Sequence, residues 1–288
     1  MSFGFSDFGS RRRLPTGRVF RSTILSLSVA TTLVMAGCAS KDDDLVDTTP
    51  PDQLYNDGLS KLSKGQTTDA IKKFEDLDRL YPYTDLAKKS ILLQAYSSFR
   101  KNDFTSAIAS SKRFITIYPN SEETAYAYYL IAESYYAQVP DLSRDQIMTQ
   151  NAYDAFTELL TKFPNSKFTE DARQKQEATR DQLAGKEMDV GRFYLKQRQY
   201  LAAINRFRVV VSKYQTTRHV EEALARLVEC YYSLGVVPEA QTAAAVLGHN
   251  FPDSKWYKDS YELLKTGGYS PEENKGSWIS KTFSTFHL

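Results

Sequence analysis

The most regular feature of the chain is an alanine that is followed, eleven positions later, by an aromatic residue. In four of five instances a proline comes directly after the aromatic residue. An apolar residue lies seven positions after every alanine, and a phenylalanine lies at position four in three of the units. The five alanines are Ala70, Ala107, Ala152, Ala203 and Ala240. Spacings of four, seven and eleven fall on one face of an α-helix, so each unit predicts one amphipathic helix.

A helical segment precedes these alanine helices. In three units a small residue lies twelve positions before the alanine, namely Gly58, Ala95 and Gly191. Two small residues at these places let two antiparallel helices approach closely. Pro-Asn-Ser or Pro-Asp-Ser follows three of the alanine helices, at 119–121, 164–166 and 252–254. The proline ends one helix, and the Asn, Asp or Ser is expected to cap the next helix.

Helix, turn and helix with these small residues, alanines and prolines resemble the tetratricopeptide repeat over about residues 54–264. Successive alanines are 37, 45, 51 and 37 residues apart, against about 34 in the standard repeat. Insertions are therefore expected around 138–150 and around 171–187, the second as a lengthened helix because it lacks proline. The predicted fold is all-α, a tetratricopeptide-repeat solenoid of about five helix-turn-helix repeats with little or no strand.

This organisation divides the chain into five parts. A leader (1–37) and a tether (38–53) come before the repeats. An N-terminal half (54–164) holds repeats one to three, and a C-terminal half (165–266) holds repeats four and five. A tail (267–288) follows Gly267-Gly268.

The leader has the pattern of a targeting segment. Arginines precede an apolar stretch from about Ile24 to Ala36, which is too short to span a bilayer comfortably. Ala36-Gly37-Cys38 resembles the lipobox of bacterial lipoproteins, although Met35 stands where leucine is usual. The resemblance implies cleavage before Cys38, a diacylglycerol on its sulfur and an acyl chain on its new amino terminus. A simple cleaved signal with a chance cysteine is the alternative.

The tether is polar and acidic and contains Pro50-Pro51. Ala39, rather than aspartate, follows the cysteine, which resembles the lipoproteins that proteobacteria export to the outer membrane. We therefore expect an anchor on the periplasmic face of the outer membrane, because each buried methylene of an acyl chain contributes about 0.8 kcal/mol. Cys230, the second of two cysteines, lies on an apolar face and is expected to be buried and inert.

Composition excludes several functions. Hydrophobic residues make up 41% of the 288 and charged residues 25%, which is typical of a globular protein. Outside the arginine-bearing leader, acidic residues slightly outnumber basic ones, so no partner nucleic acid is expected. His219, His249 and His287 are far apart, and no metal-ligand motif or phosphate-binding glycine loop is present. We predict a scaffold rather than an enzyme, with no metal and no cofactor besides the covalent lipid.

Tyrosines cluster in one expected helix, at positions 126, 128, 129, 135 and 136. Consecutive helical residues are separated by about 100°, so Tyr128 and Tyr129, or Tyr135 and Tyr136, cannot both face the same neighbouring helix. Some of these rings must face a groove or solvent, where tyrosine suits a binding surface. Packing between repeats is the alternative for each single ring.

Together, the lipobox, the acidic tether, five repeats and the insertion in the third resemble the BamD (ComL) family, lipoproteins of the outer-membrane β-barrel assembly (BAM) machine. The resemblance is carried best by residues 55–82, 141–146 and 190–207. It implies that the C-terminal repeats bind the POTRA domains of the barrel subunit BamA, next to other lipoproteins of the machine. It also implies that the N-terminal repeats receive the signal strand of unfolded outer-membrane protein precursors.

Single residues follow from this resemblance by position. Arg206, with Asn205 beside it, matches the arginine that faces BamA, although a solvated arginine beside an acidic residue is the alternative. Tyr81 and Pro82 match a place near the precursor groove, and Tyr81 could equally be the closing aromatic residue of repeat one. Two rings of the tyrosine cluster, Tyr126 and Tyr129, are predicted to line the same groove. The alternative function is a periplasmic repeat lipoprotein that recruits peptidoglycan or division enzymes.

The tail carries Trp278, Ile279, Phe283 and Phe286, which form one apolar stripe if the segment is helical. It either caps the last repeat or binds a partner. Because glycines separate it from the repeats, contact with a partner or a membrane surface is favoured.

Overall fold

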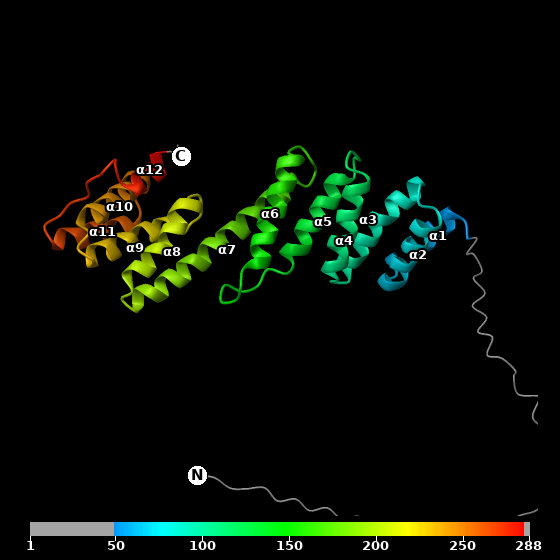
Figure 1. Ribbon diagram of the computed structural model, residues 1–288, viewed down its shortest axis with the longest axis horizontal. Coiled ribbons are helices and arrows are strands. Elements are labelled where there is room, and N and C mark those ends of the chain that lie inside the picture. The colour runs from blue at the N-terminus through cyan, green and yellow to red at the C-terminus, as the bar shows by residue number, and fades with distance from the viewer. Residues whose placement is uncertain (1–48, 285–288) are drawn as a thin grey trace, which may run out of the picture. The chain divides into compact units, whose positions relative to one another are not determined.

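A computed structural model describes residues 49–284 of the chain. Cys38, the leader, most of the tether, Phe286 and His287 lie outside the described residues, so the lipidation prediction is not addressed by it. Within residues 49–284 the backbone forms twelve α-helices and no strand, which confirms the all-α prediction (Figure 1). Of these twelve, none is both long enough and apolar enough to cross a membrane.

Ten of the helices form five antiparallel pairs along the chain. The first helix of each pair is α1 (Pro51–Ser63), α3 (Asp85–Arg100), α5 (Thr124–Tyr136), α7 (Thr169–Lys196) or α9 (Val220–Ser233). The second is α2 (Thr67–Leu80), α4 (Phe104–Ile117), α6 (Ile147–Lys162), α8 (Tyr200–Lys213) or α10 (Val237–Asn250). Helix α11 (Lys255–Thr266) packs on α9 and α10, and α12 (Trp278–Ser284) is the last.

The two helices of each pair approach closely at the predicted small residues. All five alanines of the repeat signature are fully buried in the pairs that they define. A Cβ atom added to Gly58 would lie 2.5 Å from the ring of Phe74, and one added to Gly191 would lie 2.5 Å from the ring of Phe207. These contacts confirm the register of the repeats, because the glycine on the first helix makes room for the phenylalanine on the second.

Both insertions fall where the spacing predicted them. The first is the loop between the end of α5 and Ile147, within the third repeat. The second is absorbed into α7, which runs unbroken for 28 residues. Its first turns pack against repeat three through Ala172, and its last turns pack against Phe207 in repeat four.

Two predictions about helix starts were only partly right. Helix α1 begins at Pro51, inside the expected tether, because proline is well suited to the first turn, where an N–H has no partner in the helix. Ser254 caps α11 as predicted, by accepting a hydrogen bond from the backbone N–H of Trp256. Helices α5 and α7 begin a few residues after their Pro-Asn-Ser segments, without a side-chain cap. There Ser121 and Ser166 accept hydrogen bonds within the preceding turns instead.

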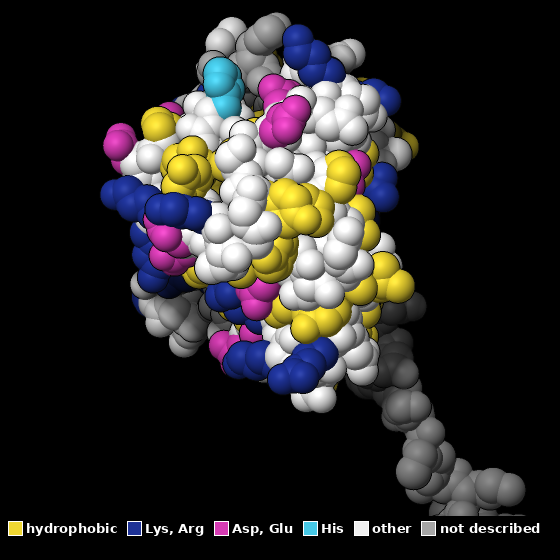
Figure 2. Space-filling view, turned by 90° about the vertical axis from the view of Figure 1, so that its left-hand side faces the viewer, with side chains coloured by type: hydrophobic (Ala, Val, Ile, Leu, Met, Phe, Trp, Pro, Cys, Tyr) yellow, Lys and Arg dark blue, Asp and Glu magenta, His cyan; other side chains and the backbone are white. Residues whose placement is uncertain are grey.

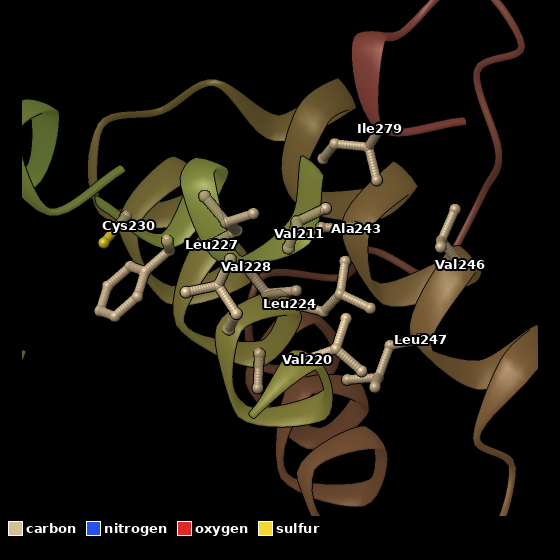
Figure 3. Packing of buried hydrophobic residues seen from close by; sticks show 14 of the residues in the cluster. Val211, Val220, Leu224, Leu227, Val228, Cys230, Ala243, Val246, Leu247 and Ile279 are labelled. Carbon is tan, nitrogen blue, oxygen red and sulfur yellow. The ribbon is translucent and has the colours of Figure 1, made fainter. Parts of the chain in front are cut away.

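The tail packs back on the repeats, so the preference for a detached tail was wrong. Helix α12 lies against α10 and α8, and Ile279 is fully buried there. Figure 3 shows the side chain of Ile279 next to those of Ala243 and Val211. The glycines form the turn that lets the chain reverse, with Gly268 at a φ of 80°. Cys230 is buried in the same hydrophobic cluster, as expected, and burial raises the pKa of its thiol to about 12.

Candidate functional site

The predicted BamA-facing residues lie on the surface of α8. Asn205 and Arg206 are both exposed, and 44% of the Arg206 side chain is accessible. One guanidinium nitrogen of Arg206 lies 3.3 Å from a carboxylate oxygen of Glu187 on α7. Arg206 is therefore held beside an acidic residue but keeps an open face, and its role toward BamA stays a prediction.

An apolar side chain on α8, which was not predicted from the sequence, extends this surface. Leu201 is 69% exposed and lies one helical turn before Asn205, so both side chains share one face of α8. The signal in the sequence was a leucine at a position outside the buried face of the repeat.

Tyr81 and Pro82 lie in the turn that follows α2. Tyr81 is half-buried, and its hydroxyl donates a hydrogen bond of 3.0 Å to the carbonyl of Thr49, so it fixes the entry of the chain into the first repeat. Pro82 is exposed, and the neighbouring Tyr83 is 98% exposed. Tyr83, which was not predicted from the sequence as a site residue, is the aromatic ring of this turn that is most accessible to a ligand.

Tyr126 and Tyr129 lie one turn apart on α5 and pack against the same ring. Their ring centroids are 5.5 and 4.6 Å from that of Phe168, at the start of α7. The Tyr129 hydroxyl donates a hydrogen bond of 2.7 Å to the carboxylate of Asp171. Burial raises the pKa of Tyr126 to about 12, and burial with the Asp171 hydrogen bond does the same for Tyr129. Both rings are half-buried at a junction between repeats, and their role toward precursors stays a prediction.

The other tyrosines of the cluster point elsewhere, as the 100° between consecutive helical residues requires. Tyr128 and Tyr135 line an open groove of about 470 Å³ between α4, α5 and α6. The ammonium group of Lys162 lies 4.7 Å above the Tyr128 ring and 2.6 Å from its hydroxyl. Tyr136 packs edge-on against the buried Phe156. The groove therefore exposes Tyr128 and Tyr135, two members of the cluster other than the pair chosen from the sequence as groove residues.

The surface of α8, α9 and α10 on which the tail packs, called here the seat of the tail, was also not predicted from the sequence. The Trp278 indole N–H donates a hydrogen bond of 3.1 Å to the Tyr231 hydroxyl on α9. The guanidinium of Arg208 on α8 lies 4.7 Å from the centroid of the same indole. Just before α12, the Ser277 hydroxyl donates a hydrogen bond to the Glu239 carboxylate on α10. The seat thus combines an aromatic anchor with polar contacts from three helices.

The surface carries charges of both signs rather than one dominant sign. Figure 2 shows Lys and Arg interspersed with Asp and Glu around hydrophobic side chains on the face that it draws. Among residues 49–284, no group of three or more His, Cys, Asp or Glu side chains is placed to hold a metal ion. The arrangement offers exposed aromatic and aliphatic side chains beside charged ones, which suits the binding of other proteins.

The repeats and their exposed side chains define a tetratricopeptide-type protein with surfaces suited to binding. A family model described as an outer membrane lipoprotein (YfiO) matches residues 47–247. The chain belongs to this YfiO/BamD family.

Relatives named outer membrane protein assembly factor BamD match most of the chain. The relative from Caulobacter vibrioides is 40% identical, over 88% of this chain and 85% of its own length. The relative from Rickettsia prowazekii is 42% identical, over 84% of this chain and 96% of its own. The relative from Neisseria meningitidis serogroup A is 32% identical, over 82% of this chain and 94% of its own.

Proposed function

We propose that the protein is an outer-membrane protein assembly factor that works by binding and not by catalysis. In this proposal it is a lipid-anchored scaffold of the BAM complex on the periplasmic face of the outer membrane. The observation that carries the proposal is the 40% identity to an assembly factor BamD over 88% of the chain. Exposed side chains suited to protein contacts, on helices that buried hydrophobic clusters hold in place, support it.

The first partner is BamA, whose POTRA domains bind the C-terminal repeats through the α8 surface. Arg206 suits this role because a half-exposed guanidinium that is already oriented by Glu187 can still fork to a carboxylate of a partner. Leu201 and Asn205, on one face of the same helix, add an apolar contact and a polar contact. Arginine is among the residues that are enriched at the centres of protein interfaces.

Affinity capture from solubilised envelopes tests this partner. The full-length wild-type protein should retain BamA. Arg206→Glu should retain much less, because the substitution removes the guanidinium and places a second carboxylate beside that of Glu187, so this surface repels a carboxylate of the partner. Arg206→Met removes the guanidinium without that repulsion and should give an intermediate loss. Lys72→Glu, an exposed charge reversal on α2 in the first repeat, is the matched control and should behave as wild type. Capture of peptidoglycan hydrolases without BamA would reject the proposal.

The second partner is the signal strand of an unfolded precursor, which the N-terminal repeats receive near Tyr81, with Pro82 and the accessible Tyr83 in the same turn. Tyr126 and Tyr129 are the other residues that this proposal places at the precursor-binding surface, which is distinct from the groove between α4, α5 and α6. Photo-crosslinking of a C-terminal barrel peptide to the full-length protein should fall in Tyr83→Ala and in Tyr81→Ala. Tyr81→Phe removes only the hydrogen bond to Thr49. It separates loss of the ring from loosening of the first repeat.

The anchor is Cys38, which carries diacylglycerol on its sulfur and an acyl chain on its amino group. Cells that are fed an alkynyl fatty acid should label the wild-type protein, and Cys38→Ser should lose the label. The buried Cys230 is the control, because Cys230→Ala should keep the label in full. Label retained by Cys38→Ser would contradict the anchor.

A further inference from the structure

The open groove between α4, α5 and α6 is the repeat-equivalent of the seat that holds the tail. Lys112 and Ile115 lie five and eight positions after the repeat alanine of α4, and Arg208 and Val211 hold the same positions on α8. Lys112 and Ile115 line the groove, and Arg208 and Val211 line the seat of α12.

The equivalence extends to the other two helices of each place. Tyr135 lies 17 residues after the aromatic residue that ends α4, and Tyr231 lies 17 residues after the one that ends α8. Ala155 on α6 and Ala243 on α10 both lie three positions after their repeat alanine. The groove therefore repeats a cation, an aliphatic side chain, a tyrosine hydroxyl and a small residue in the places where α12 is held by the same kinds of group.

This set of residues is not a general property of the repeats. At the junction of repeats one and two the corresponding positions hold Glu75, Asp78 and Ser98, and Asp78 is ion-paired with Arg113. At the junction of repeats three and four Arg180 takes the place of the tyrosine. The basic residue, the aliphatic residue and the tyrosine thus occur together at two junctions. One of these is filled by α12, and the other is open.

The groove and the seat of the tail differ in charge, and this difference points to a different ligand for the groove. Asp154 and Glu158 line the groove where Thr242 and Val246 stand in the seat of the tail. Thr242 there accepts a hydrogen bond from the backbone N–H of Asn274, four residues before Trp278. A ligand in the groove should bind more tightly when it carries a positive charge at the position that corresponds to Asn274, because the exposed carboxylate of Asp154 lines the groove there.

We propose that the groove between α4, α5 and α6 binds a short amphipathic helix of a partner protein. The helix carries a tryptophan followed by an aliphatic residue, an aromatic residue four positions further on, and a basic residue shortly before the tryptophan. The indole lies under Lys112 and donates to the Tyr135 hydroxyl, the apolar pair packs on Ile115 and Ala155, and the basic residue meets Asp154. This site is separate from the α8 surface and from the turn after α2.

A peptide with the sequence of residues 270–284 serves as the probe, together with a variant that carries Asn274→Lys. Each peptide is labelled with fluorescein, and its binding to the full-length protein in detergent is followed by anisotropy. The lysine variant should bind at least about threefold more tightly than the parent peptide. That advantage should vanish in Asp154→Asn, which keeps the shape of the groove but removes the charge.

Three protein variants locate the binding. Lys112→Glu reverses the exposed cation and should weaken binding about fivefold or more. Lys72→Glu makes the same change on α2, away from the groove, and should leave binding within twofold of wild type. Tyr135→Phe keeps the ring and removes the acceptor of the indole N–H, and a smaller loss is expected.

A photoreactive benzophenone at the position of Phe283 in the peptide shows where the peptide lies. Cross-links on α4, α5 or α6 support the proposal. Absence of saturable binding, or cross-links confined to the seat on α8 and α10, would overturn it. Sedimentation of the protein alone should show a monomer. A dimer that disappears in Trp278→Ala would also overturn the proposal, because the occupant would then be the tail of a second copy.

Discussion

The N-terminal and C-terminal repeats share one sequence signature but are joined to their neighbours in different ways. From α7 to α12 the buried apolar side chains form one continuous cluster that includes Phe207, Leu224 and Ile279. Repeats two and three hold separate, smaller clusters. Lys88 pairs with Glu123 at 2.9 Å between repeats two and three, and Lys175 pairs with Glu133 at 2.7 Å between repeat three and α7. A repeat array can therefore be held either by a shared core or by ion pairs and stacked rings between smaller cores.

The largest expected effect follows from truncating a side chain inside the continuous cluster. Phe207→Ala should lower the free energy of unfolding by about 3–5 kcal/mol, because the fully buried ring that fills the space over Gly191 is lost. Hydrogen exchange should then rise across α7 to α12 together. Phe74→Ala changes the equivalent ring of repeat one and should raise exchange only near α1 to α3. A rise confined to α7 and α8 in Phe207→Ala would break the comparison.

The next effect concerns an ion pair that joins repeat three to α7. Lys175 lies 2.7 Å from Glu133 and 2.8 Å from Asp171, and all three keep only part of their surface exposed. Burial disfavours the charged ammonium, but these hydrogen bonds outweigh burial and raise the pKa of Lys175. Lys175→Met strands Glu133, whose side chain is the least exposed of the three, and should cost about 1–3 kcal/mol in urea unfolding.

A double variant separates the stranded charge from the loss of the lysine itself. Adding Glu133→Gln should recover part of that cost, because the side chain left behind is then neutral. If the double variant is less stable than Lys175→Met, the stranded carboxylate is not the cause of the destabilisation.

The tail should contribute less than the core, because only one short helix is attached. Trp278→Ala removes the indole from Arg208 and from the Tyr231 hydroxyl, and should cost about 1–2 kcal/mol. Limited proteolysis should cut after Lys281 much faster in the variant, while the rest of α7 to α11 stays protected. Arg208→Gln, which removes only the cation, is the control and should show a smaller change. Equal cleavage in wild type and Trp278→Ala would mean that the tail does not depend on this anchor.

The smallest effect is a dependence on pH in the N-terminal repeats. A hydrogen bond from Ser121 and the contact with Lys88 lower the pKa of Glu123 from its ordinary 4.5 to about 2. The stabilisation is therefore complete above about pH 4.5 and is lost as the pH falls toward 2. Because the carboxylate is more than one third exposed, it amounts to less than about 1 kcal/mol.

Urea unfolding of wild type and Glu123→Gln at several pH values measures this contribution. The wild type should be the more stable of the two at pH 6, and the difference should shrink by pH 2.5. A difference that stays constant over this range would assign the effect of the substitution to something other than the charge.

The pairing of the repeats could be predicted because it depends on residues close in sequence. A glycine or alanine twelve positions before an alanine specifies a close crossing of two helices, and Gly58 and Gly191 both lie against a phenylalanine of the paired helix. The long α7 was predictable for the same reason, since a charged segment without proline continues a helix.

Contacts between distant segments could not be predicted in this way. Trp278 meets Tyr231 across 47 residues, and nothing in the composition of the tail distinguishes docking on the repeats from docking on a partner. The orientation of the tyrosines had the same limit. Angular spacing required neighbouring rings to diverge, but the ring that each one meets, such as Phe168 for Tyr129, depends on how consecutive repeats pack.

Helix α7 has a mechanical consequence for the whole array. Its 28 residues make a rod of about 42 Å that belongs to repeat three at one end and to repeat four at the other. A stiff rod shared by two modules behaves as a lever, because a tilt imposed on one end is delivered to the other without a loop to absorb it. Force applied where Arg206 is tied to Glu187, about two thirds of the way along this rod, would reach the junction of Asp171 with Tyr129 through continuous backbone hydrogen bonds.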